Sequence, residues 1–126
     1  MLKDFPVHPT IPAKDFERAK KFYGEKLELE VDQDTPAGTM FKIANGRLFV
    51  YPTPSAGTAE HTLIGWTVDD IEGVVKYLKG RGIKFEEYDN EYIKTVDSIA
   101  KNPNGRSAWF KDSEGNILGL FQPDEK

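Results

Sequence analysis

The sequence predicts an α+β fold in which one β-α-β-β-β unit occurs twice in a single domain. Three observations support this: a central strand–helix–strand stretch, a matching stretch 55 residues earlier, and a hairpin signal that recurs near the end of the chain. The first unit is expected to span about residues 1–53 and the second about residues 61–126, with a polar linker over about residues 53–60.

The central stretch covers residues 64–85. Its first part, Ile64–Val68, is a short apolar run typical of a buried strand, and Asp69 or Asp70 can cap the helix that follows. Four apolar residues at helical spacing predict this helix, namely Ile71, Val74, Val75 and Leu78. Gly80 and Gly82 predict the end of this helix, and a second strand is expected at residues 83–85.

The earlier stretch repeats this pattern. Three identities and four apolar matches define the register: Asp15 with Asp70, Glu17 with Glu72, Lys21 with Lys76, Phe16 with Ile71, Ala19 with Val74, Phe22 with Tyr77 and Tyr23 with Leu78. Both segments therefore predict the same helix lying on the same kind of sheet.

The remaining elements follow from local signals. In the first unit we expect a helix over residues 16–26 and strands at 5–12, 27–31, 40–44 and 47–51. Prolines place the first strand at a sheet edge, and Asn45-Gly46 is a strong hairpin signal. In the second unit, residues 86–105 are expected to be an irregular lid or binding loop. A closing hairpin with strands at 107–111 and 116–122 follows, and its Gly115 matches Gly46 at an offset of 69.

Composition narrows the class of protein. The chain has 126 residues, 38% hydrophobic and 30% charged, as expected for a globular protein. The net charge of −4 and the absence of a basic cluster argue against nucleic-acid partners. No signal peptide and no membrane span are expected. The lack of cysteine fits a cytoplasmic location and excludes thiolate chemistry.

Several motifs occur in order along the chain. They are His8-x-x-x-Pro12 ahead of Asp15–Ala19, Val68–Asp70 ahead of the second helix, and Phe110–Asn116 at the entrance to the last strand. By these motifs the chain resembles the vicinal oxygen chelate (VOC) superfamily, also called the glyoxalase/bleomycin-resistance/extradiol-dioxygenase superfamily. The resemblance implies two βαβββ modules whose curved mixed sheets form a cleft, and a homodimer that completes its clefts across the interface.

The resemblance also locates the positions that hold a divalent metal in metal-dependent members. These positions correspond to His8, Val50, Leu63 and Gly119, which the offsets of 55 and 69 also relate to one another. Only His8 carries a donor atom, whereas a catalytic metal needs about three protein ligands. We therefore expect no metal cofactor; a site built on His8 and His61 is the weaker alternative.

Strand alternation extends this set to an apolar cleft surface with a few polar groups, as in most small-molecule pockets. The candidate ligand-binding residues are His8, Thr10, Phe41, Leu48, Val50, Leu63, Gly65, Thr67, Tyr92, Trp109, Gly119 and Phe121. The aromatic members are expected to stack on a ligand. The alternative is that the apolar residues fill the core or face a dimer partner. His8 is the candidate catalytic residue, as a general base, or else has only a structural role.

These observations predict a cytoplasmic homodimer that binds a small apolar or aromatic molecule without metal, in the manner of antibiotic-binding resistance proteins. The first alternative is an enzyme. It would be a glyoxalase- or dioxygenase-type lyase or oxidoreductase with an atypical metal site, or a metal-free acid–base enzyme using His8. The second is a structural or regulatory subunit whose cleft is filled by its own side chains. No nucleic-acid or membrane partner is expected.

Overall fold

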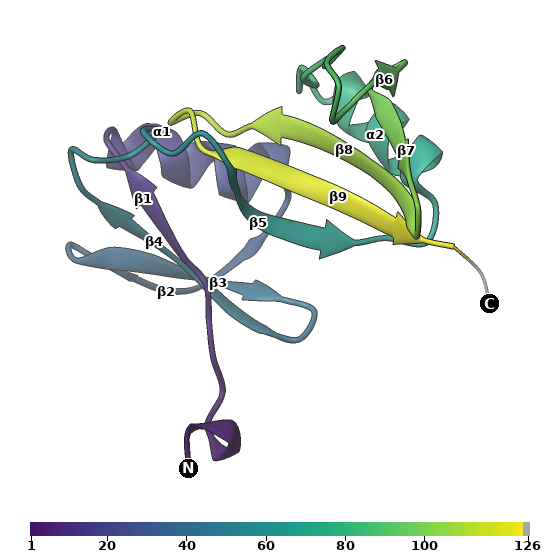
Figure 1. The fold of residues 1–126 in the computed structure, drawn as a ribbon. Coiled ribbons are helices and arrows are strands. Elements are labelled where there is room, and N and C mark those ends of the chain that lie inside the picture. Colours follow the sequence, from purple (N-terminus) through teal and green to yellow (C-terminus); the bar gives the residue numbers. More distant parts are fainter. Residues whose placement is uncertain (125–126) are drawn as a thin grey trace. The chain divides into compact units, whose positions relative to one another are not determined.

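Each half of the chain folds around its own mixed β-sheet, on which one main helix lies (Figure 1). The computed structural model describes residues 1–124. Unit 1 comprises residues 1–58 together with 113–115, and unit 2 comprises residues 59–112 and the chain from 116 onward. The predicted α+β class, with two VOC-type mixed sheets, is confirmed.

The sheet of unit 1 has the order β1-β4-β3-β2. Its strands are β1 (Thr10–Ala13), β2 (Glu30–Thr35), β3 (Gly38–Ile43) and β4 (Gly46–Pro52). Strand β1 pairs parallel to β4 alone, so its predicted edge position is confirmed. The hairpin predicted at Asn45-Gly46 is confirmed by the antiparallel pairing of β3 with β4.

The helix of unit 1 begins where the sequence predicts. The Asp15 carboxylate accepts a hydrogen bond from the Arg18 amide at 3.1 Å and caps α1 (Phe16–Lys21). The helix then widens into a π-helical segment, η2 (Phe22–Lys26). Tyr23, in η2, is fully buried in the core of the unit.

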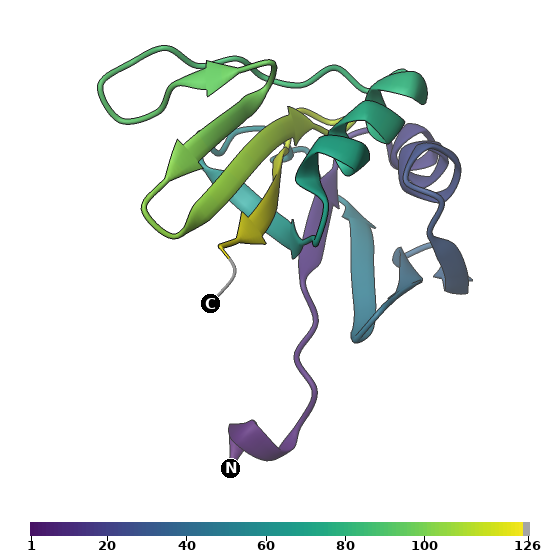
Figure 2. The same cartoon turned by 90° about the vertical axis from the view of Figure 1, so that its right-hand side faces the viewer.

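The strand predicted at residues 5–12 begins only at Thr10. The chain before it forms a short 3₁₀ turn, η1 (Leu2–Asp4), and an extended arm that leaves the sheet (Figure 2). Proline has no amide proton to donate, so Pro6 and Pro9 cannot extend the ladder. The apolar residues of this segment predicted a buried strand, but the structure leaves Val7 91% exposed.

The sheet of unit 2 has the order β5-β9-β8-β7-β6, in which β5 runs parallel to β9. Its strands are β5 (Thr62–Thr67), β6 (Thr95–Val96), β7 (Ile99–Asn102), β8 (Gly105–Lys111) and β9 (Ile117–Pro123). Helix α2 (Ile71–Gly80) lies against β8 and β9. Of the two aspartates that could cap it, Asp70 does so by accepting a hydrogen bond from the Gly73 amide at 3.1 Å.

Two predictions for unit 2 are corrected. The strand expected at residues 83–85 is reduced to a single bridge between Phe85 and Phe110. The segment 86–105, expected to be irregular, contains β6 and β7, joined by a tight turn in which Asp97 and Ser98 have positive φ angles of 50° and 73°. The Glu87 carboxylate holds this turn, and such a tertiary contact leaves no local sequence signal.

None of the helices within residues 1–124 combines the length and the apolar character that crossing a membrane would require.

Candidate functional site

The unit 2 sheet has one face that α2 does not cover. Across β5, β9 and β8 the register sets Gly65 beside Gly119 and Gly119 beside Trp109. Two residues further along β5 and β9, Thr67 lies beside Phe121. Side chains alternate between the two faces of a sheet, so these residues share a face, while Leu118 and its like-facing neighbours are buried under α2. We call this surface the open face, formed by Gly65, Thr67, Trp109, Gly119 and Phe121.

Trp109 is the largest side chain of the open face. The Tyr88 ring meets it edge-on, with centroids 5.5 Å apart and planes at 82°. A Cβ atom added to Gly119 would lie 3.2 Å from Cγ2 of Thr62 and 3.5 Å from Cδ1 of the indole, so the Gly119 backbone packs against both side chains. Gly119 is buried by these neighbours, whereas Gly65 beside it is exposed and supplies the accessible glycine backbone of the open face.

Tyr88 borders the open face and is not among the candidate residues predicted from the sequence. It belongs to the segment that was expected to be a loop, and it reaches Trp109 because the Glu86 amide donates to the Trp109 carbonyl at 2.8 Å. Burial raises the pKa of the Tyr88 phenol, and the nearby Glu86 carboxylate adds to this effect. The phenol is therefore protonated and uncharged at neutral pH.

Two further candidates of unit 2 lie at the beginning of β5. A register shift between Thr62 and Ile64 places Leu63 at a bulge, where strand alternation is interrupted. His61 is exposed just before the strand, with its Nδ1 atom 3.1 Å from the Thr62 carbonyl oxygen. Tyr92 lies elsewhere, in a groove beside α2.

The candidates of unit 1 fall into two groups. His8 and Thr10 are exposed, His8 in the arm before β1 and Thr10 at its first residue. Phe41, Leu48 and Val50 are at most 1% exposed and lie in the core of the unit, where Phe41 packs on Tyr23 with ring centroids 6.2 Å apart. In this structure the three buried side chains have almost no surface to offer a ligand.

The register explains this difference. Thr10 pairs with Phe49 in unit 1, and Gly65 pairs with Gly119 in unit 2. Phe49, rather than Val50, is therefore the counterpart of Gly119. Phe49 and Tyr51 are partly exposed and stack with centroids 6.1 Å apart at 8°. The alternation of two aromatic residues in β4 is a signal that could have identified them.

Unit 1 has the order βαβββ, and unit 2 has the same order with one more strand, β6. In each unit the first strand is parallel to the last, and this pair of units defines the class. The family model described as Glyoxalase/Bleomycin resistance protein/Dioxygenase superfamily matches residues 6–120. The chain therefore belongs to this superfamily, and the resemblance inferred from the sequence motifs is confirmed. No curated protein matches the sequence.

Solved structures give further relatives. TnmS3, an antibiotic binding protein from Streptomyces sp. CB03234, is 26% identical, with a TM-score of 0.70 and 93% of each chain covered. A glyoxalase/bleomycin resistance protein/dioxygenase from Alicyclobacillus acidocaldarius is 19% identical over 97% of this chain and 93% of the other, with a TM-score of 0.71. The fosfomycin resistance protein FosX from Listeria monocytogenes is 15% identical over 95% and 93%, with a TM-score of 0.70. The last two likenesses concern the fold alone.

The side chains at the family's metal positions do not fit a divalent ion. His8 supplies one imidazole, but Leu63 and Gly119 supply no donor atom, and neither Val50 nor its neighbour Phe49 supplies one. Within residues 1–124, no three His, Cys, Asp or Glu side chains gather closely enough to hold a metal. These side chains therefore do not provide the three protein ligands that a catalytic divalent metal needs.

Proposed function

We propose that this protein binds a small apolar or aromatic molecule on the open face of unit 2, without a metal ion. The observation that carries the proposal is the pair of adjacent strand glycines, Gly65 and Gly119, beside the Trp109–Tyr88 aromatic pair. Glycine inside a strand weakens the strand and often marks a place where a ligand approaches the backbone closely. Here Gly65 is exposed and its neighbour Gly119 packs against the Trp109 indole, so a ligand on the Gly65 backbone would lie close to the aromatic pair.

The chemistry of this surface selects the class of ligand. Trp109 and Phe121 offer ring surface for stacking. Thr67, which is exposed, and Tyr88 offer hydroxyl groups, and because the Tyr88 phenol is uncharged it can donate a hydrogen bond to a carbonyl oxygen. None of the five open-face residues is ionised, and Lys111, two residues along β8 from Trp109, is neutralised by an ion pair with Glu86 at 3.7 Å. We therefore expect a neutral, planar molecule with one or two polar atoms.

The relatives support a binding role. TnmS3, which matches this chain over 93% of both lengths, is an antibiotic binding protein. We extend that role to this chain as part of the proposal. We also propose that it acts as a cytoplasmic homodimer, as its family resemblance implies, and light scattering during size-exclusion chromatography would test this: twice the chain mass is expected, and the mass of one chain would refute it.

Tryptophan fluorescence tests ligand binding directly. The chain has two tryptophans, and Trp66 pairs with Leu120 on the side opposite the open face. In a Trp66→Phe variant, Trp109 is therefore the sole tryptophan reporter. Titration with a panel of planar aromatic compounds should quench this emission, and a bound compound should raise the melting temperature by mass action.

A glycine substitution locates the site. In Gly119→Val, the new side chain begins 3.2 Å from Thr62 and 3.5 Å from the Trp109 indole and displaces these neighbours from their present positions, so we expect affinity to fall about tenfold or more. Gly80→Ala is the matched control, because a Cβ atom at Gly80 meets nothing within 4 Å. The proposal fails if no compound binds, or if Gly119→Val and Gly80→Ala bind equally well.

A further inference from the structure

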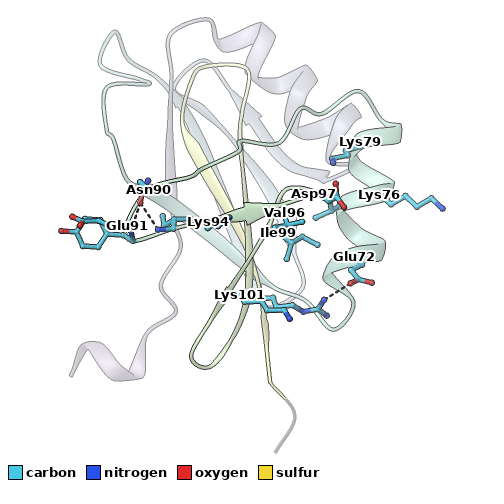
Figure 3. Close-up of a pocket in the computed structure, with 14 residues that line it drawn as sticks. Glu72, Lys76, Lys79, Asn90, Glu91, Lys94, Val96, Asp97, Ile99 and Lys101 are labelled. Carbon is cyan, nitrogen blue, oxygen red and sulfur yellow. Dashed lines mark hydrogen bonds and ion pairs between the residues drawn. The ribbon is translucent and has the colours of Figure 1, made fainter.

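A second recess of unit 2 lies on the side of the sheet that α2 covers. This α2 groove has a volume of about 1020 Å³ and runs between α2 and the chain from Asn90 to Ile99, with β7 and β8 as its base (Figure 3). Its size matches the upper end of small-molecule sites, which span about 300–1,000 Å³. It shares no residue with the open face and is independent of the function proposed above.

Cationic side chains line up across the base of the α2 groove. Lys101 on β7 pairs with Arg106 on β8. Lys94 directly precedes β6, whose Thr95 pairs with Ala100, and it lines the groove on the side of Asn90 (Figure 3). Two cations therefore lie side by side on β7 and β8, and Lys94 adds a third at the other end of this lysine row, although like charges placed directly opposite each other destabilise a sheet.

Only one of these three charges is neutralised within the protein. Arg106 forms an ion pair with Glu72 of α2 at 3.0 Å. In the part of the chain that the structure describes, Lys94 and Lys101 make no ion pair. The groove as a whole is lined by five cationic and three acidic side chains, in a chain whose net charge is −4. An unpaired lysine pair in this setting favours an anion.

Apolar side chains continue the groove next to the cations. Val96 pairs with Ile99 two residues beyond the lysine row and so on the same face. Figure 3 shows Val96 and Ile99 between the Asn90–Lys94 loop and α2. Val96 is 67% exposed and Tyr92, at the rim, is 87% exposed. The surface therefore combines a charged row with an adjoining apolar row.

The walls of the α2 groove are held in place by hydrogen bonds. The Glu87 carboxylate accepts from the Thr95 hydroxyl at 2.6 Å, the Ser98 hydroxyl at 2.7 Å and the Ser98 amide at 3.1 Å. The Asn90 side chain accepts from the Tyr92 and Ile93 amides at 2.8 and 2.9 Å. A preformed site loses less conformational entropy when a ligand binds.

We propose that the α2 groove binds an amphipathic organic anion. Its carboxylate or sulfonate contacts Lys94 and Lys101, and its apolar part covers Val96 and Ile99 and packs under Tyr92. Glu91 and Asp97 also line the groove, and they disfavour any ligand that carries a second negative charge. The two acids and the single row of lysines suit a small ligand with one acidic group better than a polyanion.

Two dyes of nearly equal shape test this proposal: 8-anilinonaphthalene-1-sulfonate, which is anionic, and N-phenyl-1-naphthylamine, which is neutral. Decanoate serves as a competing carboxylate. Fluorescence titration measures affinity, and amide chemical-shift mapping on the full chain locates the bound dye. We expect the anionic dye to shift residues 90–101 and decanoate to displace it, and the neutral dye to leave these residues unshifted.

Charge removal supplies the decisive comparison. In Lys94→Gln/Lys101→Gln, anionic-dye affinity should fall about fivefold or more, while the melting temperature should stay equal or rise because a like-charge repulsion is removed. Lys3→Gln/Lys14→Gln removes the same charge from exposed residues outside the groove and should leave affinity within about twofold.

Three results would overturn the proposal: equal dye affinity in the two double variants, shifts confined to the open face, or binding of an acidic peptide to residues 90–101 without binding of either small anion. The last result would assign the groove to a protein partner instead.

Discussion

Replacing Glu114 should destabilise unit 1 more than any other substitution of a single carboxylate that we consider. The Glu114 side chain is fully buried, although it carries a charge. It accepts hydrogen bonds from Arg18 Nε at 2.8 Å and Nη2 at 3.2 Å, from the Asp15 amide at 2.7 Å and from the Ser113 hydroxyl at 2.9 Å. These contacts hold the beginning of α1.

The magnitude follows from these contacts. A hydrogen bond to a charged group contributes about 1.5–3 kcal/mol, and breaking a buried ion pair costs about 3–5 kcal/mol. Arg18 is 54% exposed and regains water when its partner is lost, which reduces the cost. We therefore expect Glu114→Gln to lose about 2 kcal/mol. With about 2.1 cal/mol/K of unfolding entropy per residue, a chain of 126 residues should melt about 8 °C lower.

The pH dependence of this loss identifies its origin. Burial raises the pKa of Glu114, but the hydrogen bonds from Arg18, the Asp15 amide and Ser113 outweigh burial and leave the pKa below its ordinary value. The stabilisation is thus fully present above the pKa of the unfolded chain, about 4.3, and is lost as the pH falls through the lower folded pKa. Urea unfolding at several pH values should show a constant deficit between about pH 6 and 8 that shrinks below about pH 4.

The control for Glu114 is Glu17, which lies on α1, the helix whose beginning Glu114 holds. Glu17 forms an ion pair with Lys20, but its side chain is 77% exposed, so Glu17→Gln should change stability by less than about 0.5 kcal/mol. If Glu114→Gln is as stable as the wild type at pH 7, or if its deficit grows as the solution is acidified, the buried ion pair does not stabilise unit 1.

Three further substitutions test how the fold is held. Gly105→Ala should lower the free energy of unfolding in urea by about 2 kcal/mol, because the new Cβ would overlap the Gln122 carbonyl oxygen and lie 2.8 Å from the Phe121 ring. Gly80→Ala, where the new Cβ meets open space, should raise it by about 0.5–1 kcal/mol. Equal effects of the two substitutions would contradict this reasoning. Asp70→Ala should lose about 1 kcal/mol of capping energy and lower the melting temperature, while Asp69→Ala should not, and the reverse order would assign the cap to Asp69. Hydrogen bonds from Thr95 and Ser98 lower the pKa of Glu87, so Glu87→Gln should speed hydrogen exchange at the Ser98 amide at neutral pH, and unchanged exchange would show that Glu87 does not hold the turn.

Sequence reasoning predicted the elements whose signals are local. The caps at Asp15 and Asp70 and the turn at Asn45-Gly46 each depend on one or two residues and their immediate neighbours. The strands β6 and β7 depend instead on the Glu87 carboxylate, which reaches Ser98 across eleven residues. Nothing local distinguishes such a residue from an ordinary exposed glutamate, so this hairpin could not be predicted.

The candidate site was only partly predictable for a similar reason. Adding 55 to Thr10 gives Gly65, and the structure places these two residues at matching positions of β1 and β5. The second offset, 69, was taken from the turns at Gly46 and Gly115. The turn between β8 and β9 contains Asp112–Asn116, whereas Ala44 and Asn45 alone separate β3 from β4, so the true offset at Phe49 and Gly119 is 70. An error of one residue exchanges the two faces of a strand.

The same alternation keeps the two proposed sites of unit 2 separate. Along β8, Trp109 faces the open face and Arg106, three residues earlier, faces the α2 groove, so the two sides of one strand serve different ligands. Aromatic rings and bare glycine backbone select a neutral planar molecule, whereas the lysine row selects an anion. Gly119→Val should therefore weaken neutral ligands while leaving anionic-dye binding within about twofold. Lys94→Gln/Lys101→Gln should do the opposite. If either variant weakens both classes of ligand in titrations of the same preparation, the two surfaces do not act as independent sites.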